Sequence, residues 1–345
     1  MLYAEVSSKA AALGVPLAVH LDLTYRCNED CVHCYLEHTG GEFTTLEVRG
    51  VLEQLASAGC LFVAVSGGEP FLRRDLFTVL ESASALKFGI RLKTNATLIG
   101  PAEASRIRQF RPERVDVSLY SLRAAVHDAI TRAPGSLERT LRGIRHLREE
   151  GVRVALTHVI TALNASEYQE VMAFATDIGA KFQFDAMITP KVSGDRSTVR
   201  LNVPREALHS LLRDHRLLPM WEEFCKPPEA PDGDFLDGAG CGALQSACYI
   251  SPVGDVYPCV QWPVLLGNIR RTSFEEIWRG PQAESLRAVR NRDLPQCSRC
   301  SHFSVCQRCP GLACMEGDPL GPSSQNCEFA AARTGTHPAI LHRSA

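Results

Sequence analysis

Six short apolar runs, each separated from the next by a helical pattern, organise the chain up to residue 188. The runs cover residues 19–24, 61–66, 91–95, 115–120, 152–160 and 182–188. One helical segment begins with Thr44 and Glu47 at the spacing of a capping box. Another repeats apolar residues at helical intervals, at Leu137, Leu141, Ile144 and Leu147. Strands that alternate with helices predict βαβ units, a parallel sheet and right-handed crossovers.

Composition and charge indicate the class of protein and exclude some binding partners. The 345 residues, 45% hydrophobic and 22% charged, indicate a globular protein with room for two or three domains. The formal net charge is -2 and no basic stretch is interleaved with aromatic residues, so we expect neither nucleic acid nor an acidic membrane surface as a partner. No run approaches the roughly 18 apolar residues of a membrane helix, and the first nine residues lack the regions of a signal peptide. In the cytoplasm that this predicts, the 14 cysteines indicate metal or redox chemistry.

Three cysteines follow the first apolar run directly. Cys27, Cys31 and Cys34 are spaced as Cys-x3-Cys-x2-Cys, with no fourth cysteine near. A [4Fe-4S] cluster takes four thiolates, so this loop would leave one iron open to a ligand that the protein does not supply. A zinc knuckle, the alternative, usually shows paired Cys-x2-Cys units with a fourth ligand in reach.

The loop resembles that of the radical S-adenosylmethionine (SAM) family, whose open iron chelates the methionine end of SAM. The resemblance implies a partial (βα)6 barrel with its site at the carboxyl edge of the strands. Gly67, Gly68 and Glu69 resemble the family's GGE motif, in which the glycines allow close backbone approach and the glutamate meets the SAM ammonium. Asn95 and Ser118 resemble the positions that bind the SAM ribose and carboxylate, although each could be only a cap or turn former.

A second cysteine-rich region begins at Cys241. The segment from Cys248 to Cys259 predicts a short hairpin that turns at Gly254 and would hold both thiols near one metal. With the later Cys-x2-Cys pairs and Cys327, the region resembles the SPASM domain, which carries two auxiliary [4Fe-4S] clusters. A zinc ribbon built on Cys-x2-Cys pairs is the alternative. The expected fold class is therefore α/β, a partial barrel followed by a small cysteine-rich SPASM domain.

The resemblance also implies which cysteines bind which cluster. The first auxiliary cluster would take Cys241, Cys248, Cys259 and Cys309. The second would take Cys297, Cys300, Cys306 and Cys327, which gives three clusters in all. Cys314 stays an alternative to Cys309, because many members space this pair by three residues rather than two.

Three cysteines remain outside these sets. Cys60 precedes the second apolar run, so we expect it to be buried at the face of the barrel away from the chemistry. Cys225 and Cys314 are candidate catalytic donors of a hydrogen atom to a substrate radical, unless they are ordinary buried thiols. The expected segments are an N-terminal extension (1–15), the barrel (16–200), bridging helices and a linker (201–237), the SPASM domain (238–330) and a tail (331–345).

The architecture resembles the maturases of pyrroloquinoline quinone, mycofactocin and thioether peptides. It implies an oxidoreductase that cleaves SAM to a 5'-deoxyadenosyl radical and takes hydrogen from a ribosomally synthesised peptide. About 15 residues precede the barrel, too few for a leader-recognition domain, so a separate recognition protein, or none, is expected beside the peptide substrate and a flavodoxin- or ferredoxin-type electron donor. The alternatives are a tetrapyrrole enzyme acting on haem precursors and a sulfatase-type maturase that forms formylglycine.

Overall fold

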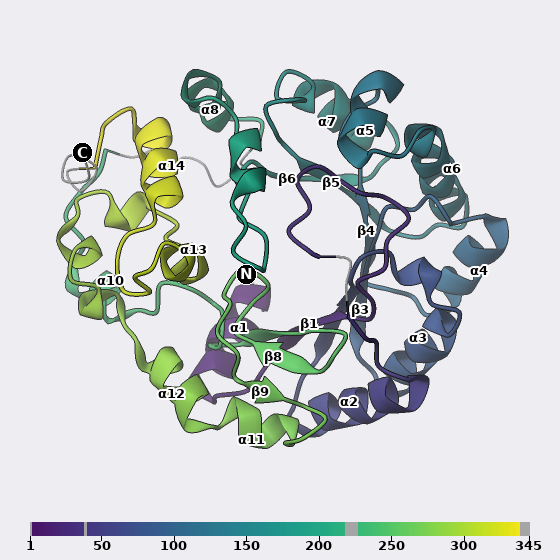
Figure 1. The fold of residues 1–345 in the computed structure, drawn as a ribbon, viewed down its shortest axis with the longest axis horizontal. Coiled ribbons are helices and arrows are strands. Elements are labelled where there is room, and N and C mark those ends of the chain that lie inside the picture. Colours follow the sequence, from purple (N-terminus) through teal and green to yellow (C-terminus); the bar gives the residue numbers. More distant parts are fainter. Residues whose placement is uncertain (1, 38–39, 218–226, 339–345) are drawn as a thin grey trace.

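A curved sheet of nine strands forms the centre of the computed structural model, which describes residues 2–37, 40–217 and 227–338 (Figure 1). The strand order is β6-β5-β4-β3-β2-β1-β7-β8-β9. All six apolar runs are confirmed as strands that pair in parallel with their neighbours. They are β1 (Ala18–Asp22), β2 (Phe62–Ser66), β3 (Gly89–Thr94), β4 (Arg114–Ser118), β5 (Val154–Val159) and β6 (Lys181–Asp185).

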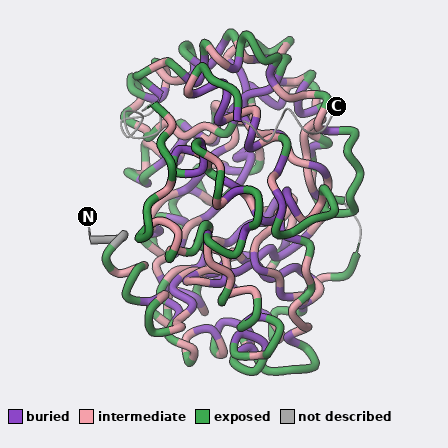
Figure 2. Tube along the Cα trace, turned by 90° about the vertical axis from the view of Figure 1, so that its left-hand side faces the viewer, coloured by how far each residue is buried: buried purple, intermediate pink, exposed green. Residues whose placement is uncertain are grey.

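Helices cover the convex face of these strands, at the right of Figure 1. They are α2 (Thr45–Ser57), α3 (Leu76–Ala85), α4 (Pro101–Gln109), α5 (Ala124–Thr131), α6 (Ser136–Glu149) and α7 (Tyr168–Asp177). The capping box of Thr44 and Glu47 is present at the start of α2, and Leu137, Ile144 and Leu147 of α6 are buried. Buried positions concentrate inside the molecule and exposed ones along its outer helices and loops (Figure 2). The helices and strands that the sequence pattern predicts therefore pack as two layers around one core.

The cysteine-rich region continues the same sheet. Strand β7 (Ala247–Ile250) pairs in parallel with β1, so that Cys248 lies opposite Val19. The predicted hairpin is confirmed: β7 turns at Gly254 into the antiparallel β8 (Asp255–Tyr257), followed by β9 (Gly267–Asn268). Gly254 has φ +93°, a left-handed value that glycine adopts without strain. The sheet thus joins the two cysteine-bearing regions directly.

The remaining helices lie around this junction and beside it. They are α1 (Leu2–Ala12), α8 (Arg205–Leu212), α10 (Gly233–Asp237), α11 (Phe274–Trp278), α12 (Pro281–Ala288), α13 (Pro310–Met315) and α14 (Ser324–Thr334). Helices α8 and α14 pack together in a second small core, which contains Leu208, Leu212 and Ala332. No helix of the described ranges has the length and apolar character that crossing a bilayer requires.

Candidate active site

A cavity of about 370 Å³ lies at the carboxyl edge of the barrel strands, and Cys27, Cys31 and Cys34 all line it. Burial raises the pKa of Cys27 to about 12, and the nearby carboxylates of Glu69 and Glu29 add to the effect. A bound metal would reverse this, because a cation stabilises thiolates. Three thiols on one wall of a cavity are the donor set that a cluster with one open iron requires.

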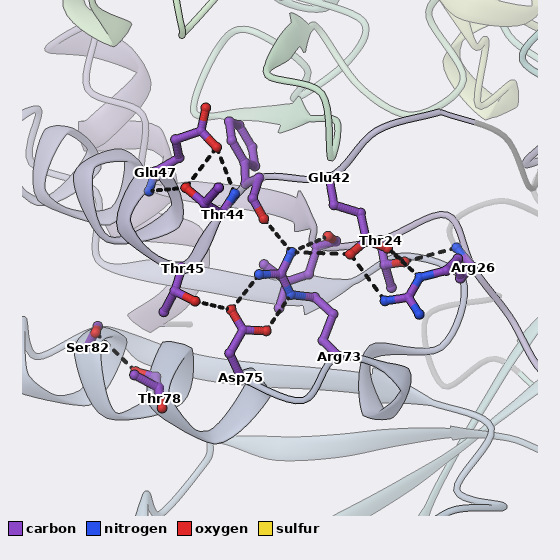
Figure 3. Close-up of polar contacts among 12 residues, drawn as sticks. Thr24, Arg26, Glu42, Thr44, Thr45, Glu47, Arg73, Asp75, Thr78 and Ser82 are labelled. Carbon is purple, nitrogen blue, oxygen red and sulfur yellow. Dashed lines mark hydrogen bonds and ion pairs between the residues drawn. The ribbon is translucent and has the colours of Figure 1, made fainter.

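The loop that carries these cysteines is fastened at both ends by Arg73. This buried guanidinium donates from Nη1 to the carbonyl oxygens of Leu23, before the loop, and Phe43, after it, at 3.0 and 2.8 Å. Asp75 holds the other side of the guanidinium with two hydrogen bonds of 2.9 and 2.6 Å (Figure 3). Thr24 and Arg26 both donate to Glu42, which closes the loop a second time (Figure 3). The three cysteines therefore sit on a loop whose ends are fixed to each other.

The glycine pair lets the end of β2 lie directly on the start of this loop. The N–H of Gly68 donates to the carbonyl of Thr24 at 2.7 Å. A Cβ atom on Gly67 would lie 2.2 Å from the carbonyl oxygen of Thr24, and one on Gly68 would lie 2.2 Å from that of Arg26. Because real Cβ atoms do not approach backbone so closely, only glycine fits at either position. Both glycines also line the cavity.

Glu69, the last residue of the motif, is fully buried behind the cavity wall. Its carboxylate accepts hydrogen bonds from Thr94 Oγ1 (2.8 Å), the Asn95 N–H (2.8 Å) and the Phe71 N–H (3.1 Å). Burial raises its pKa to about 7 although these hydrogen bonds oppose the shift. In the protein alone, Glu69 therefore ties the ends of β2 and β3 together, and its contact with the SAM ammonium stays a prediction.

Asn95, directly after β3, and Ser118, the last residue of β4, do line the cavity. The Asn95 side chain donates to Asn28 Oδ1 at 2.8 Å, which links β3 to the cysteine loop. Nearby, the buried oxygen Glu29 Oε1 has no hydrogen-bond partner among the described residues. An orphaned buried acceptor beside three thiols fits a cavity that is completed by a polar ligand.

Several residues of this cavity were not found from the sequence. Each of the six barrel strands contributes an unassigned polar side chain: His20, Ser66, Lys93, Asp116, Thr157 and Asp185. In β1 a signal was available, because Val19 and Leu21 alternate with His20 and Asp22 and period-two alternation separates two faces. The opposite wall comes from the cysteine-rich region, through Val260 and Gln261.

Three of the expected ligands of the first auxiliary cluster lie together. Burial raises the pKa of Cys259 to about 12, with further contributions from the neighbouring thiols of Cys309 and Cys241. Cys309 likewise raises the pKa of Cys241, after burial. The structure therefore brings Cys309, not Cys314, to this set. Cys314 lies on α13, where burial alone raises its pKa.

Cys248, the fourth expected ligand, lies elsewhere. It is 3% exposed in the main apolar core, where burial and then the thiol of Cys60, itself buried as expected, raise its pKa. Because successive side chains of a strand point to opposite faces, Cys248 shares a face with Val19, whereas the next residue, Tyr249, contacts His20 and Asp22 on the cavity side. The structure does not bring Cys248 to Cys241, Cys259 and Cys309, and the expectation that the hairpin holds Cys248 and Cys259 near one metal was wrong for this reason.

The four cysteines expected to bind the second auxiliary cluster lie together. A small cavity of about 20 Å³ is lined by all four expected cysteines, which are Cys297, Cys300, Cys306 and Cys327. Burial raises the pKa of Cys327 to about 12, and the other three thiols contribute.

Cys225, one of the two candidate hydrogen donors, lies outside the described residues. The other, Cys314, is not among the residues that line the barrel cavity.

The described ranges contain no group of three or more His, Cys, Asp or Glu side chains placed to hold a single metal ion. A [4Fe-4S] cluster needs a wider set, since each thiolate binds a different iron. We therefore treat these thiol sets as candidate sites of clusters.

Comparison with protein families agrees with the two regions of the fold. Residues 21–178 match the radical SAM superfamily, and residues 241–301 match the SPASM iron-sulfur cluster-binding domain. The chain is therefore a radical SAM enzyme that carries a SPASM domain, as its cysteine patterns predicted. These domains support SAM and iron-sulfur clusters as its cofactors.

The curated relatives fall into more than one functional group. The chain is 28% identical over 328 residues to the AdoMet-dependent heme synthase of Methanosarcina barkeri, an alignment that covers 88% of this chain and 93% of the relative. It is 29% identical over 339 residues to the mycofactocin maturase MftC of Mycolicibacterium smegmatis, covering 91% and 83%. Sequence similarity of this size does not separate the two groups.

Solved structures share the fold. SuiB of Streptococcus suis bound to its precursor peptide SuiA superposes with a TM-score of 0.72 at 17% identity, over 94% of this chain and 80% of SuiB. The anSMEcpe protein with AdoMet and a peptide gives 0.69 at 17% identity, over 92% and 96%. At this identity the likeness shows the architecture alone.

Proposed function

We propose that this radical SAM/SPASM enzyme modifies a ribosomally synthesised peptide. The observation that carries the proposal is the charge of the barrel cavity. Its described lining contains one lysine and no arginine, together with the acidic side chains of Glu29, Asp116 and Asp185. Burial raises the pKa of Glu29 to about 7 and also raises the pKa of Asp185. The lining therefore offers a single permanently cationic side chain, Lys93, to a substrate carboxylate.

This lining suits a peptide better than a haem precursor. Tetrapyrrole precursors carry several carboxylates, and proteins recognise carboxylates best through the planar fork of arginine. A peptide segment presents amides and uncharged side chains, which polar groups and apolar walls bind. The cavity offers both, since Thr157, Gln261 and Ser118 line it beside Val159, Met187 and Ile188.

Within the site, each part of the chain has a defined task. Cys27, Cys31 and Cys34 would hold the cluster, while Gly67 and Gly68 shape the wall against which SAM would lie. Asn95 and Ser118 would orient the ribose and carboxylate of SAM. When bound, SAM and the cluster supply a 5'-deoxyadenosyl radical that abstracts a hydrogen atom from the substrate. The enclosing barrel and the Val260 segment keep water from this reaction.

We further propose two auxiliary clusters, three in all. Cys297, Cys300, Cys306 and Cys327 would bind one, and Cys241, Cys259 and Cys309 would provide three ligands of the other. A flavodoxin- or ferredoxin-type protein would supply the reducing electron, and a separate protein could recognise the leader peptide. The mycofactocin maturase relatives support the peptide as substrate.

A tetrapyrrole substrate is the second candidate, because the chain matches heme synthases over most of its length. Formylglycine formation stays the third candidate. The test is to express the chain with the peptide encoded by a short open reading frame beside its gene, and to offer the purified, cluster-loaded enzyme coproporphyrin in parallel. A mass change of the peptide that needs Cys27, Cys31 and Cys34 supports the proposal. Turnover of the porphyrin carboxylates with an unmodified peptide would overturn it.

A further inference from the structure

A chain of hydrogen bonds runs from the barrel cavity toward the first auxiliary set. His20, on β1, lines the cavity, and its Nε2 lies 2.9 Å from Asp22 Oδ1. The other oxygen of Asp22 accepts a hydrogen bond from Tyr249 at 2.9 Å. The Tyr249 oxygen in turn lies 2.9 Å from that of Tyr25, which must be the donor because Tyr249 already donates to Asp22. The network thus joins the barrel to β7.

The geometry defines what His20 can do. Asp22 is 0% exposed, and its two oxygens lie within hydrogen-bond distance of His20 Nε2 and of the Tyr249 hydroxyl. A carboxylate that accepts from Nε2 fixes the tautomer in which Nδ1 is unprotonated. No described residue hydrogen-bonds Nδ1. A histidine oriented by a buried carboxylate, with its second nitrogen free, is the arrangement of a general base.

The network reaches a second cavity, of about 350 Å³, which is lined by Tyr25, Tyr249, Tyr257 and Cys259. Val260 lines both this cavity and the barrel cavity. The segment that carries Cys259 is therefore a shared wall. An iron-sulfur acceptor held by Cys259 would lie directly behind the site where a substrate reacts.

The chemistry of a peptide radical needs such a pair of acceptors. Loss of a hydrogen atom leaves one unpaired electron on carbon. To end as a double bond or as a new crosslink, the peptide must also lose one electron and one proton, so the product is two hydrogens lighter. Epimerisation instead requires a hydrogen atom to be returned, and the described cavity lining holds no cysteine besides the three of the cluster loop.

We propose that His20 is the proton acceptor of this reaction and that the enzyme oxidises its peptide by two hydrogens. With SAM and the clusters bound, one hydrogen atom would leave to the 5'-deoxyadenosyl radical and the proton would go to His20 Nδ1. A cluster held by Cys259 would supply the acceptor for the remaining electron. Asp22 acts as a positioning residue through His20, and Tyr249 holds Asp22. This inference rests on the proposed peptide substrate and names the type of reaction.

The experiment compares His20→Gln with the wild-type holoenzyme, on the peptide encoded beside the gene and deuterated at its side chains. In the variant, deuterium should still pass into 5'-deoxyadenosine within about threefold of the wild-type rate, because SAM cleavage does not need His20. Oxidised peptide formed per 5'-deoxyadenosine should fall at least about tenfold. The electron paramagnetic resonance signal of a reduced auxiliary cluster, formed on turnover by the wild type, should be lost.

Two further variants keep the test decisive. Asp22→Asn keeps His20 but weakens the contact that orients it, so oxidised peptide per 5'-deoxyadenosine should fall by a smaller factor than in His20→Gln. If His20→Gln loses its iron, Asp22→Asn takes its place in the test. His146→Gln, at a half-buried position of α6 outside the cavity lining, makes the same substitution away from the site and should leave this ratio unchanged. An unchanged ratio, or a parallel fall of 5'-deoxyadenosine and product, would overturn the role of His20. A peptide that the wild type does not modify would instead overturn the proposed substrate.

Discussion

Cys248 lies opposite Val19 across the pairing of β7 with β1, with its thiol on the face of the sheet that packs against helices. The neighbouring Tyr249 lies on the other face, where it donates to Asp22. Two consecutive residues of β7 therefore serve different parts of the protein: Cys248 packs in the apolar core, and Tyr249 belongs to the hydrogen-bond chain that begins at His20. The register of β7 against β1 decides which cysteines can reach the first auxiliary site.

Cys248→Ala should leave the iron content unchanged, because the thiol belongs to the apolar core. Cys259→Ala, the matched control just after the neighbouring strand β8, should lose about four iron per chain, one cluster's worth. The substitution of Cys248 should instead cost about 1 kcal/mol of unfolding free energy, typical of a truncated core residue. Iron analysis of anaerobically reconstituted proteins measures both. Equal iron loss in the two variants would return Cys248 to the ligand set.

The sequence predicted the strands well and the junction poorly, for a physical reason. The strand positions follow from local apolar runs, and their ends differ from the structure by only a few residues. The pairing of β7 with β1 has no local signal, because Tyr249 and Asp22 are 227 residues apart in the chain. Cysteine spacing alone therefore grouped Cys248 with Cys259, whereas the face of each side chain depends on a long-range register.

Removal of the three loop cysteines should abolish both one cluster and the cleavage of SAM. Replacing Cys27, Cys31 and Cys34 by Ala should lower iron from about 12 to about eight per chain, if three clusters are present. The variant should form no 5'-deoxyadenosine with SAM and dithionite, because no open iron remains to bind SAM. Iron analysis and chromatography of the nucleoside measure the two effects. Iron that is unaffected by the triple change, or stoichiometric zinc, would contradict the assignment of the loop.

Arg73→Ala should loosen the cluster loop without touching a ligand. The change removes hydrogen bonds to the carbonyls of Leu23 and Phe43 and leaves the Asp75 side chain with only the hydrogen bond from Thr45. Hydrogen bonds from a charged donor contribute about 1.5 kcal/mol or more each, so we expect faster loss of the cluster during gel filtration. Arg74→Ala is the control, because Arg74 is the exposed neighbour on the same turn. Equal iron retention by both variants would show that the loop does not depend on Arg73.

Glu69 should make the protein less stable as pH rises toward neutrality. Its pKa in the fold is raised from 4.5 to about 7 by burial, so between these values the folded state keeps a proton that the unfolded state releases. The unfolding free energy therefore falls over this range, by about 3 kcal/mol at 1.36 kcal/mol per pKa unit. Glu69→Gln should remove this part of the slope, leaving the smaller part that belongs to Glu29, whose pKa is also raised to about 7. Thermal unfolding measured between about pH 4 and about pH 8, a range that extends beyond both pKa values, tests this. A slope that is identical in the variant would mean that Glu69 is already ionised in the folded protein.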